Sequence, residues 1–131
     1  LKKISKKLGI EKKIFFITDA SRTKMKKELW NSNCFLSSSL HETFGVVLIE
    51  SLAYGIPIVS TKSEGPSEIV DKFSGILIKH NDILSYKNAM LKFFFKKFKF
   101  NKTNLRKKII DRFGSRQFIY NTTKIYNKCM N

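Results

Sequence analysis

The chain has 131 residues, of which 42% are hydrophobic, and this length and composition fit one domain with a hydrophobic core rather than two. Lysine and arginine outnumber aspartate and glutamate by 26 to 10, which gives a formal net charge of +16. With two cysteines and no apolar run approaching the roughly 20 residues of a membrane span, the sequence excludes a disulfide framework and a transmembrane helix.

The first part of the chain alternates between predicted helices and predicted strands. In chain order we expect a lysine-rich helix over 2–9, a strand over 14–18, a helix over 23–31, a strand over 34–37, a helix over 45–54, a strand over 57–61, a helix over 66–71 and a strand over 75–79. Each predicted strand is a continuous apolar run, which is typical of a parallel sheet with helices on both faces. The predicted fold class is therefore α/β.

From residue 82 onward the sequence predicts only helices, over 82–99, 102–113 and 115–128. The first of these carries a run of phenylalanines and lysines within 92–100. We expect one face of this helix to pack on the core, namely Leu91, Phe94, Phe95 and Phe98. The alternative is that the aromatic and lysine side chains lie in a membrane interface.

Three loops follow predicted strands and should therefore meet at one edge of the sheet. They are Thr18–Ser21, Ser38–Gly45 and Lys62–Gly65. In sheets of this kind, ligands bind beyond the carboxyl ends of the strands. We expect the ligand site at this edge.

Two carboxylates, Glu42 and Glu50, stand eight positions apart around a predicted start of a helix. Glu42 lies before the helix, while Glu50 projects from its second turn, with the unpaired N–H groups of the first turn between them. A helix N-terminus attracts phosphate, and carboxylates accept hydrogen bonds from sugar hydroxyls. The pattern is compatible with a phosphorylated sugar ligand. The alternative is a capping carboxylate followed by a solvated helix residue.

The segment from Ser38 to Val70 resembles the core signature of the retaining family 4 glycosyltransferases, also called group 1 glycosyltransferases. The residues that carry the resemblance are Ser38-Ser39-Leu40-His41-Glu42-Thr43-Phe44-Gly45, Glu50-Ser51, Gly55-Ile56-Pro57-Ile58-Val59 and Gly65-Pro66-Ser67-Glu68-Ile69-Val70. Their order and spacing hold over more than thirty positions, which makes the match specific. The resemblance extends from about Leu8 to Tyr126.

This resemblance implies the C-terminal, Rossmann-like domain of a two-domain GT-B enzyme. Such a domain holds a nucleoside-diphosphate sugar, here expected to be UDP- or GDP-linked, and needs no metal or other cofactor. It implies transfer of a hexose-type sugar with retained anomeric configuration, in the synthesis of a bacterial surface polysaccharide or glycolipid.

The resemblance also implies a role for each site residue. Glu42 would be the carboxylate of the catalytic site and would hydrogen-bond the hydroxyls of the transferred sugar. Glu50 would bind the ribose hydroxyls, and Thr18 and Ala20 would border the base. The diphosphate would meet the start of the helix at Thr43, Phe44, Gly45 and Val46.

The sequence departs from the family signature at several points. Ser38 replaces the usual proline, and Thr18 stands where a glycine is usual beside the base. The arginine and lysine that neutralise the diphosphate, the first two strands and the N-terminal acceptor domain have no counterpart. We therefore expect 1–131 to be a single, truncated nucleotide-sugar-binding domain, with 82–131 as its helical C-terminal region, and to be inactive by itself.

Two alternatives remain open for the function. One is a non-catalytic remnant or split subunit that binds a nucleotide sugar. The other is a small basic nucleic-acid-binding protein, but only four of the 26 basic residues are arginines, so nucleic acid is not the expected partner. The two cysteines fit a cytoplasmic location, and the charge favours peripheral contact with the anionic inner-membrane surface.

Overall fold

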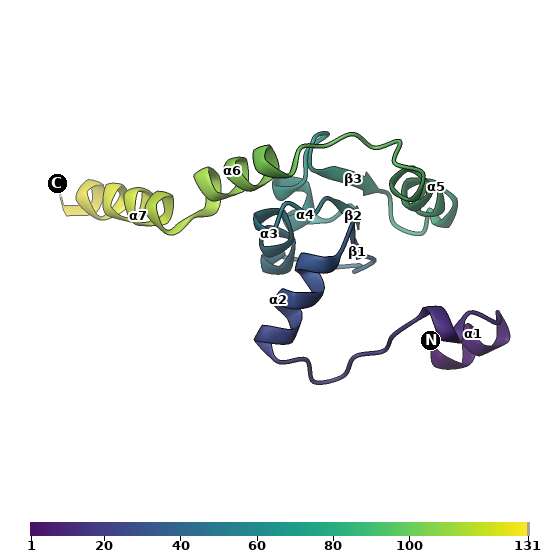
Figure 1. The fold of residues 1–131 in the computed structure, drawn as a ribbon. Helices are drawn as coiled ribbons and strands as arrows, with labels where there is room; N and C mark the ends of the chain where they lie inside the picture. The colour runs from purple at the N-terminus through teal and green to yellow at the C-terminus, as the bar shows by residue number, and fades with distance from the viewer. Residues whose placement is uncertain (131) are drawn as a thin grey trace.

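Three parallel strands form the sheet of the structure, a computed structural model that describes residues 1–130 (Figure 1). The elements are α1 (Lys2–Lys7), a short 3-10 helix η1 (Glu11–Lys13), α2 (Arg22–Asn31), β1 (Phe35–Ser37), α3 (Val46–Ala53), β2 (Ile58–Thr61), α4 (Glu64–Ile69), β3 (Gly75–Ile78), α5 (Ile83–Phe94), α6 (Lys102–Phe113) and α7 (Ser115–Met130).

The strands lie in the order β1-β2-β3, so each strand pairs with its neighbour in sequence. Phe35 pairs with Ile58, and Ile58 pairs with Gly75, in parallel register. Each parallel connection is a crossover through one helix, α3 and then α4. Because such crossovers are right-handed, both helices lie on the same face of the sheet.

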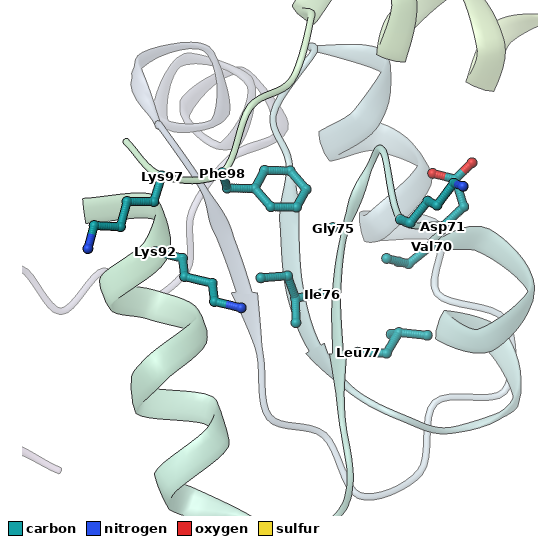
Figure 2. A pocket seen from close by; sticks show the side chains of 9 residues that line it. Val70, Asp71, Gly75, Ile76, Leu77, Lys92, Lys97 and Phe98 are labelled. Carbon is teal, nitrogen blue, oxygen red and sulfur yellow. The ribbon is translucent and has the colours of Figure 1, made fainter. Parts of the chain in front are cut away.

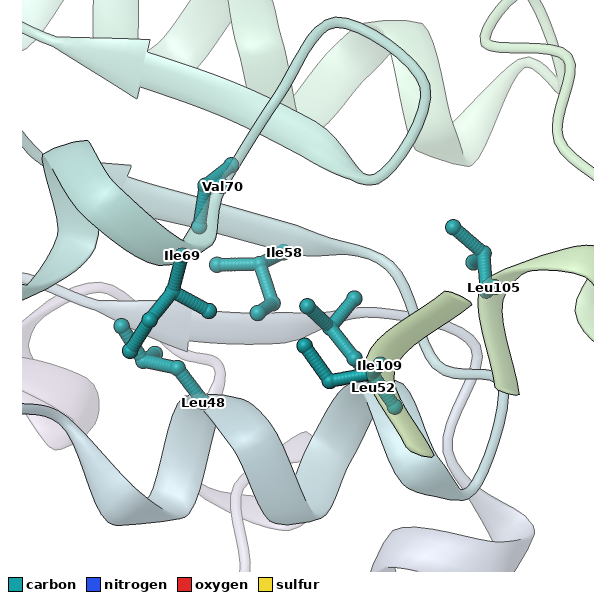
Figure 3. Packing of buried hydrophobic residues seen from close by; sticks show 7 residues of the cluster. All are labelled: Leu48, Leu52, Ile58, Ile69, Val70, Leu105 and Ile109. Carbon is teal, nitrogen blue, oxygen red and sulfur yellow. The ribbon is translucent and has the colours of Figure 1, made fainter. Parts of the chain in front are cut away.

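The larger part of the core lies on that face. Figure 3 shows Leu48 and Leu52 of α3 directed toward Ile58 of β2, and the cluster is completed by α4 and α6. The buried members of the cluster are Leu48, Leu52, Ile58, Ile69, Val70, Leu105 and Ile109.

The opposite face of the sheet is covered by α5. Val59 follows Ile58 and points to this other face, where it packs with Ile78 and Ala89. The hydroxyl of Tyr86 donates a hydrogen bond of 3.3 Å to the carbonyl oxygen of Val59. The predicted parallel sheet with helices on both faces is therefore confirmed.

The predicted inward face of the helix over 82–99 is wrong. Ala89 and Phe93 face the sheet, while Phe94 and Phe95 are 78% and 60% exposed. The inward face of α5 is formed by Tyr86, Ala89 and Phe93, and Phe94 lies one position beyond it. Phe95 and Phe98 follow the end of α5 at Phe94, and the chain turns at Lys96, which has a φ of 53°. Beyond that turn, helical spacing no longer decides which side chains share a face.

The predicted strand over 14–18 is also wrong. The chain there is extended but forms no ladder, and Phe15 is 86% exposed. A strand needs a hydrogen-bonded neighbour. In Figure 1 this segment runs from α1 to α2 away from the three strands, so no neighbour is at hand. The helix predicted over 66–71 begins two residues earlier, at Glu64, and places Pro66 inside its first turn.

The helical C-terminal region contains α5, α6 and α7, as predicted. α6 packs on the core through Leu105 and Ile109, whereas α7 has no buried residue and extends away from the sheet (Figure 1). Among residues 1–130, none of the helices has the length and apolarity required to span a bilayer.

Candidate functional site

The turn before α3 depends on Gly45. Its φ of 82° lies in the left-handed region, which a glycine adopts without strain, and it is the N-cap residue of α3. The carbonyl oxygen of Gly45 accepts the N–H of Leu48 at 2.9 Å, which begins the helix. The first N–H groups of a helix have no partner within it, so this end of α3 can receive an anion.

Glu42 is held against this turn. The half-buried carboxylate accepts a hydrogen bond of 3.0 Å from the backbone N–H of Gly45 through Oε1. This contact matches the capping alternative. The carboxylate can also accept from a ligand, because it has a second oxygen and further lone pairs.

The loops after β1 and β2 are joined beside Glu42. The hydroxyl of Thr61 donates a hydrogen bond to the carbonyl oxygen of Ser39, and the hydroxyl of Ser39 donates to the carbonyl oxygen of His41 at 3.1 Å. Near this junction lies Ser63, whose Oγ is buried and has no hydrogen-bond partner within the described residues 1–130. The structure thus brings together two of the three loops predicted at this edge.

Glu50 lies in the second turn of α3 and lines a pocket of about 670 Å³ between α2, α3 and α6. This volume is within the range of roughly 300–1,000 Å³ that is usual for ligand pockets. Nη2 of Arg22 lies 3.7 Å from Oε1 of Glu50. The pocket is lined by Arg22, Met25, Lys26, Leu29, Trp30, Val46, Glu50, Ala53, Tyr54, Arg106 and Ile110.

The structure brings some of the predicted site residues together and leaves others apart. Val46 and Glu50 line the same pocket, and Glu42 contacts Gly45. Thr43 and Phe44 lie in the turn between Glu42 and Gly45. Phe44 is half exposed, and its ring stands 6.3 Å from that of Phe113.

Thr18 and Ala20 precede α2 and are not among the residues that line the pocket of Glu50. Thr18 is exposed and Ala20 is half-buried. Their predicted place beside the base of a nucleotide stays a prediction.

Sequence reasoning missed the basic side chains of the pocket, which are Arg22, Lys26 and Arg106. Arg22 and Lys26 could have been found, because they share the helix that follows a predicted ligand loop. No signal in the sequence connects Arg106 to Glu50, because the packing of α6 on α3 alone brings them to one pocket.

A second hollow lies at the other end of the sheet. Figure 2 shows Phe98 and Lys92 on one side of it and Val70 and Asp71 on the other, with the start of β3 between them. It measures about 540 Å³. Gly75 lines this hollow and is the first residue of β3, so the hollow lies at the amino ends of the strands. Ligands of parallel sheets bind at the opposite edge, beyond the carboxyl ends of the strands.

Among residues 1–130, no group of three or more His, Cys, Asp or Glu side chains is placed to hold a metal ion.

Burial raises the pKa of the Cys34 thiol to about 11, and a backbone hydrogen bond lowers it by a smaller amount. The thiol is therefore protonated at neutral pH.

Comparison with known proteins places this geometry in a family. The family model described as "Glycosyl transferases group 1" matches residues 1–112. Sucrose-phosphate synthase of Spinacia oleracea is 44% identical over 59 residues, which are 44% of this chain and 6% of that protein. Sucrose-phosphate synthase 4 of Arabidopsis thaliana is 42% identical over 59 residues, again 44% of this chain and 6% of that protein.

A solved structure shares the fold over nearly the whole chain. The apo form of the lipopolysaccharide outer core galactosyltransferase WaaB superposes with a TM-score of 0.83 at 23% sequence identity, over 97% of this chain and 37% of that one. This likeness shows the GT-B-type fold, and the chain corresponds to well under half of the proteins it resembles. Since the family model covers most of its length, the chain belongs to the group 1 glycosyltransferases.

Proposed function

We propose that this chain is the donor-binding portion of a retaining glycosyltransferase. The observation that carries the proposal is that Val46, in the first turn of α3, and Glu50, in its second turn, line one pocket. An anion at the start of the helix and hydroxyls at Glu50 match the diphosphate and the ribose of a nucleotide sugar, which are neighbouring groups. The transferred sugar is a hexose type, and the product belongs to a bacterial surface polysaccharide or glycolipid.

Each residue then has a separate task. The N–H groups at the start of α3 bind the diphosphate, Glu50 accepts the ribose hydroxyls, and Glu42 accepts hydroxyls of the transferred sugar. Catalysis rests on stabilising the negative charge that develops on the departing diphosphate. Attack by the acceptor from the same face of the sugar retains the anomeric configuration.

The acceptor side of the reaction belongs to a companion N-terminal domain in this proposal. This chain covers 37% of the superposed galactosyltransferase structure, and the transfer needs groups that bind the acceptor. We therefore expect little transferase activity from the 131-residue chain alone. The proposed location is the cytoplasm, with peripheral contact to an anionic membrane surface favoured by the net charge of +16.

Isothermal titration calorimetry with UDP and GDP tests the proposal on the 131-residue chain. We expect binding of one of the two, and we expect Glu50→Ala to weaken it by about tenfold, since hydrogen bonds to a carboxylate are lost. Glu28→Ala is the matched control, because Glu28 lies on α2 and does not line the pocket.

Two results would overturn this function. The first is that neither nucleotide binds the unchanged chain. The second is tight, strongly salt-dependent binding of RNA or DNA that is indifferent to Glu42→Ala and Glu50→Ala, which would instead favour a basic nucleic-acid-binding protein. Nucleotide binding without transfer after a companion domain is supplied would favour a non-catalytic remnant.

A further inference from the structure

The segment at the end of α5 presents aromatic and basic side chains to solvent. Phe94 and Phe95 are both exposed, and their rings stand 5.2 Å apart. Lys92, Lys96 and Lys97 lie around them and are exposed as well. An exposed apolar patch with a polar rim marks an interaction surface.

A lysine in a left-handed conformation ends α5 and fixes the shape of this surface. Lys96 has a φ of 53°, which glycine usually supplies at the end of a helix. The N–H of Lys97 donates to the carbonyl oxygen of Lys92 at 2.8 Å. The N–H of Lys96 donates to the carbonyl oxygen of Phe93 at 3.0 Å. Two bonds of this kind close a helix in the Schellman motif, so the turn is held by its own backbone.

Three further phenylalanines hold the turn against the body of the protein. The rings of Phe93 and Phe98 stand 4.5 Å apart, and those of Phe98 and Phe100 stand 6.2 Å apart. Phe93 and Phe100 pack against the two clusters of the core. Figure 2 shows the ring of Phe98 directed toward β3, while Lys97 points away from it. The other two rings of the segment are left to project into solvent.

The charge of this part of the chain is of one sign. No aspartate or glutamate occurs between Asp82 and Asp111. Neither Lys96 nor Lys97 forms an ion pair among residues 1–130. Nζ of Lys97 lies 6.0 Å from the centre of the Phe95 ring, so charge and aromatic surface are presented together. The surface is complementary to a partner that is anionic outside and apolar inside.

An apolar groove continues this surface toward β1. The groove measures about 950 Å³ and lies between the start of β1 and the end of α5. Phe94 is part of its lining, together with Met90, Leu91 and Leu36, which are partly exposed. The exposed apolar area therefore extends over two elements of the fold.

The aromatic and basic surface lies apart from the donor site. Lys92, Lys97 and Phe98 line the hollow beside Gly75, at the amino ends of the strands. Glu42 follows β1 and lies at the carboxyl ends. A partner bound to this surface would therefore leave the donor site open.

We propose that the phenylalanine–lysine segment, residues 92–100, binds the surface of an anionic bilayer. The rings of Phe94 and Phe95 enter the interface, while Lys96 and Lys97 stay at the level of the lipid phosphates. A second copy of this chain docked through the same segment would bring like charges together. The inference rests on the membrane contact in the proposed function and names the surface that makes it.

Co-sedimentation of the 131-residue chain with vesicles tests the inference. Vesicles of phosphatidylcholine alone are compared with vesicles of equal parts phosphatidylcholine and phosphatidylglycerol. One double variant is Phe94→Ser with Phe95→Ser. The other is Lys96→Gln with Lys97→Gln.

Two double variants elsewhere in the chain are the matched controls. Phe118→Ser with Ile119→Ser removes an adjacent pair of exposed apolar side chains from α7. Lys24→Gln with Lys27→Gln removes two exposed lysines from α2. Circular dichroism checks that every variant is folded.

We expect the unchanged chain to bind the anionic vesicles at least about tenfold more tightly than the phosphatidylcholine vesicles. Each variant of the segment should lose about tenfold in affinity for the anionic vesicles. Each control should lose less than about twofold, because its side chains lie away from the lipid.

Phe94→Trp reports whether the ring enters the interface. On anionic vesicles, its tryptophan emission should shift to shorter wavelength and be quenched by brominated acyl chains. The emission of Trp30, the single tryptophan of the unchanged chain, is subtracted. Contact through charge alone would change neither signal.

Three outcomes would overturn this inference. If the anionic vesicles bind all variants equally, the membrane contact stands but does not depend on this segment. If the unchanged chain does not prefer anionic vesicles, the membrane contact itself fails, while the donor-binding function stands on its nucleotide titrations. If single-stranded oligouridylate binds in place of the vesicles and the phenylalanine variant abolishes that binding, the partner of the segment is a nucleic acid.

Discussion

The backbone N–H of Gly65 donates a hydrogen bond of 3.0 Å to the carbonyl oxygen of Glu42. Gly65 lies in the first turn of α4, so this bond joins the loop after β2 to the loop after β1. These two segments of the chain approach so closely that a Cβ on Gly65 would stand 2.5 Å from the carbonyl oxygen of Phe44. The position of the Glu42 carboxylate therefore depends on a residue that does not itself contact the pocket of Glu50.

Gly65→Ala should disturb the candidate site and the fold together. The added methyl group meets backbone atoms of Phe44, which can move only if the loop carrying Glu42 moves. We expect the free energy of unfolding to fall by about 1–3 kcal/mol. Urea unfolding followed by circular dichroism measures this change.

Glu68→Ala is the matched control, since Glu68 lies on the exposed side of the same helix and the change keeps its backbone carbonyl, which accepts a hydrogen bond from Arg112. It should change the free energy of unfolding by no more than about 0.5 kcal/mol. If Gly65→Ala were as stable as the unchanged chain and bound nucleotide equally well, the close approach would not matter for the site.

Glu42→Ala should weaken the binding of the nucleotide sugar more than the binding of the nucleotide alone. If Glu42 accepts hydroxyls of the transferred sugar, the variant should lose about tenfold in affinity for the nucleotide sugar and little in affinity for the nucleotide alone. Competition titrations with both ligands give the two affinities. Glu68→Ala, on the exposed side of α4, should change neither.

An equal loss for both ligands would contradict the sugar-binding role of Glu42. It would instead mean that the carboxylate acts through its 3.0 Å hydrogen bond with Gly45, by holding the start of α3 in place. The two roles are therefore distinguishable in one experiment.

The sheet was predictable where each apolar run also had a neighbour. The runs that became β1, β2 and β3 pair with one another in sequence order, so local pattern and global fold agree. The run over 14–18 has the same composition but lies away from the three strands, and pairing is not encoded in the run itself. The inward face of α5 was missed because it contains Ala89 and Phe93 instead of Phe94, and because the helix ends before Phe95 and Phe98.

The candidate site was predictable only where it is local in the chain. The turn of Glu42 and Gly45 and the position of Glu50 follow from residues within a span of nine. Arg106 enters the same pocket through the burial of Leu105 and Ile109 against α3, a long-range contact that no local pattern specifies. Helix packing therefore decides which basic side chains line the pocket of Glu50.

The turn before β3 should lose stability in acid through Asp71. Burial alone would raise the pKa of this carboxyl, but hydrogen bonds from Lys108, Ser74 and Phe73 outweigh it and hold the pKa below its usual value. Nζ of Lys108 lies 2.6 Å from Oδ2 of Asp71. Because the folded pKa is depressed, this stabilisation is present above a pH of about 4 and is lost as the pH falls through the folded pKa.

Asp71→Asn isolates the charge, since the amide keeps an oxygen that can accept the N–H groups of Phe73 and Ser74. The partners are exposed, so we expect the variant to be less stable by only about 0.5–1 kcal/mol at pH 7. The difference should shrink as the pH falls below about 4. Asp111→Asn on α6 is the control, and a difference that stayed constant with pH would contradict the ion pair.

The exposed face of α7 should govern association of the chain. Phe118 and Ile125 are 68% and 65% exposed and lie seven residues apart, so they share one face of the helix. An exposed apolar surface of this kind is typical of a protein–protein contact.

We expect the double change Phe118→Ser and Ile125→Ser to reduce self-association in sedimentation velocity, while the free energy of unfolding changes by no more than about 0.5 kcal/mol. Tyr120→Ser, on the other side of α7, is the matched control, because Tyr120 is 61% exposed but lies apart from this face. Loss of association with Tyr120→Ser alone, or a chain that is equally associated in all variants, would show that this face of α7 is not the surface through which the chain associates.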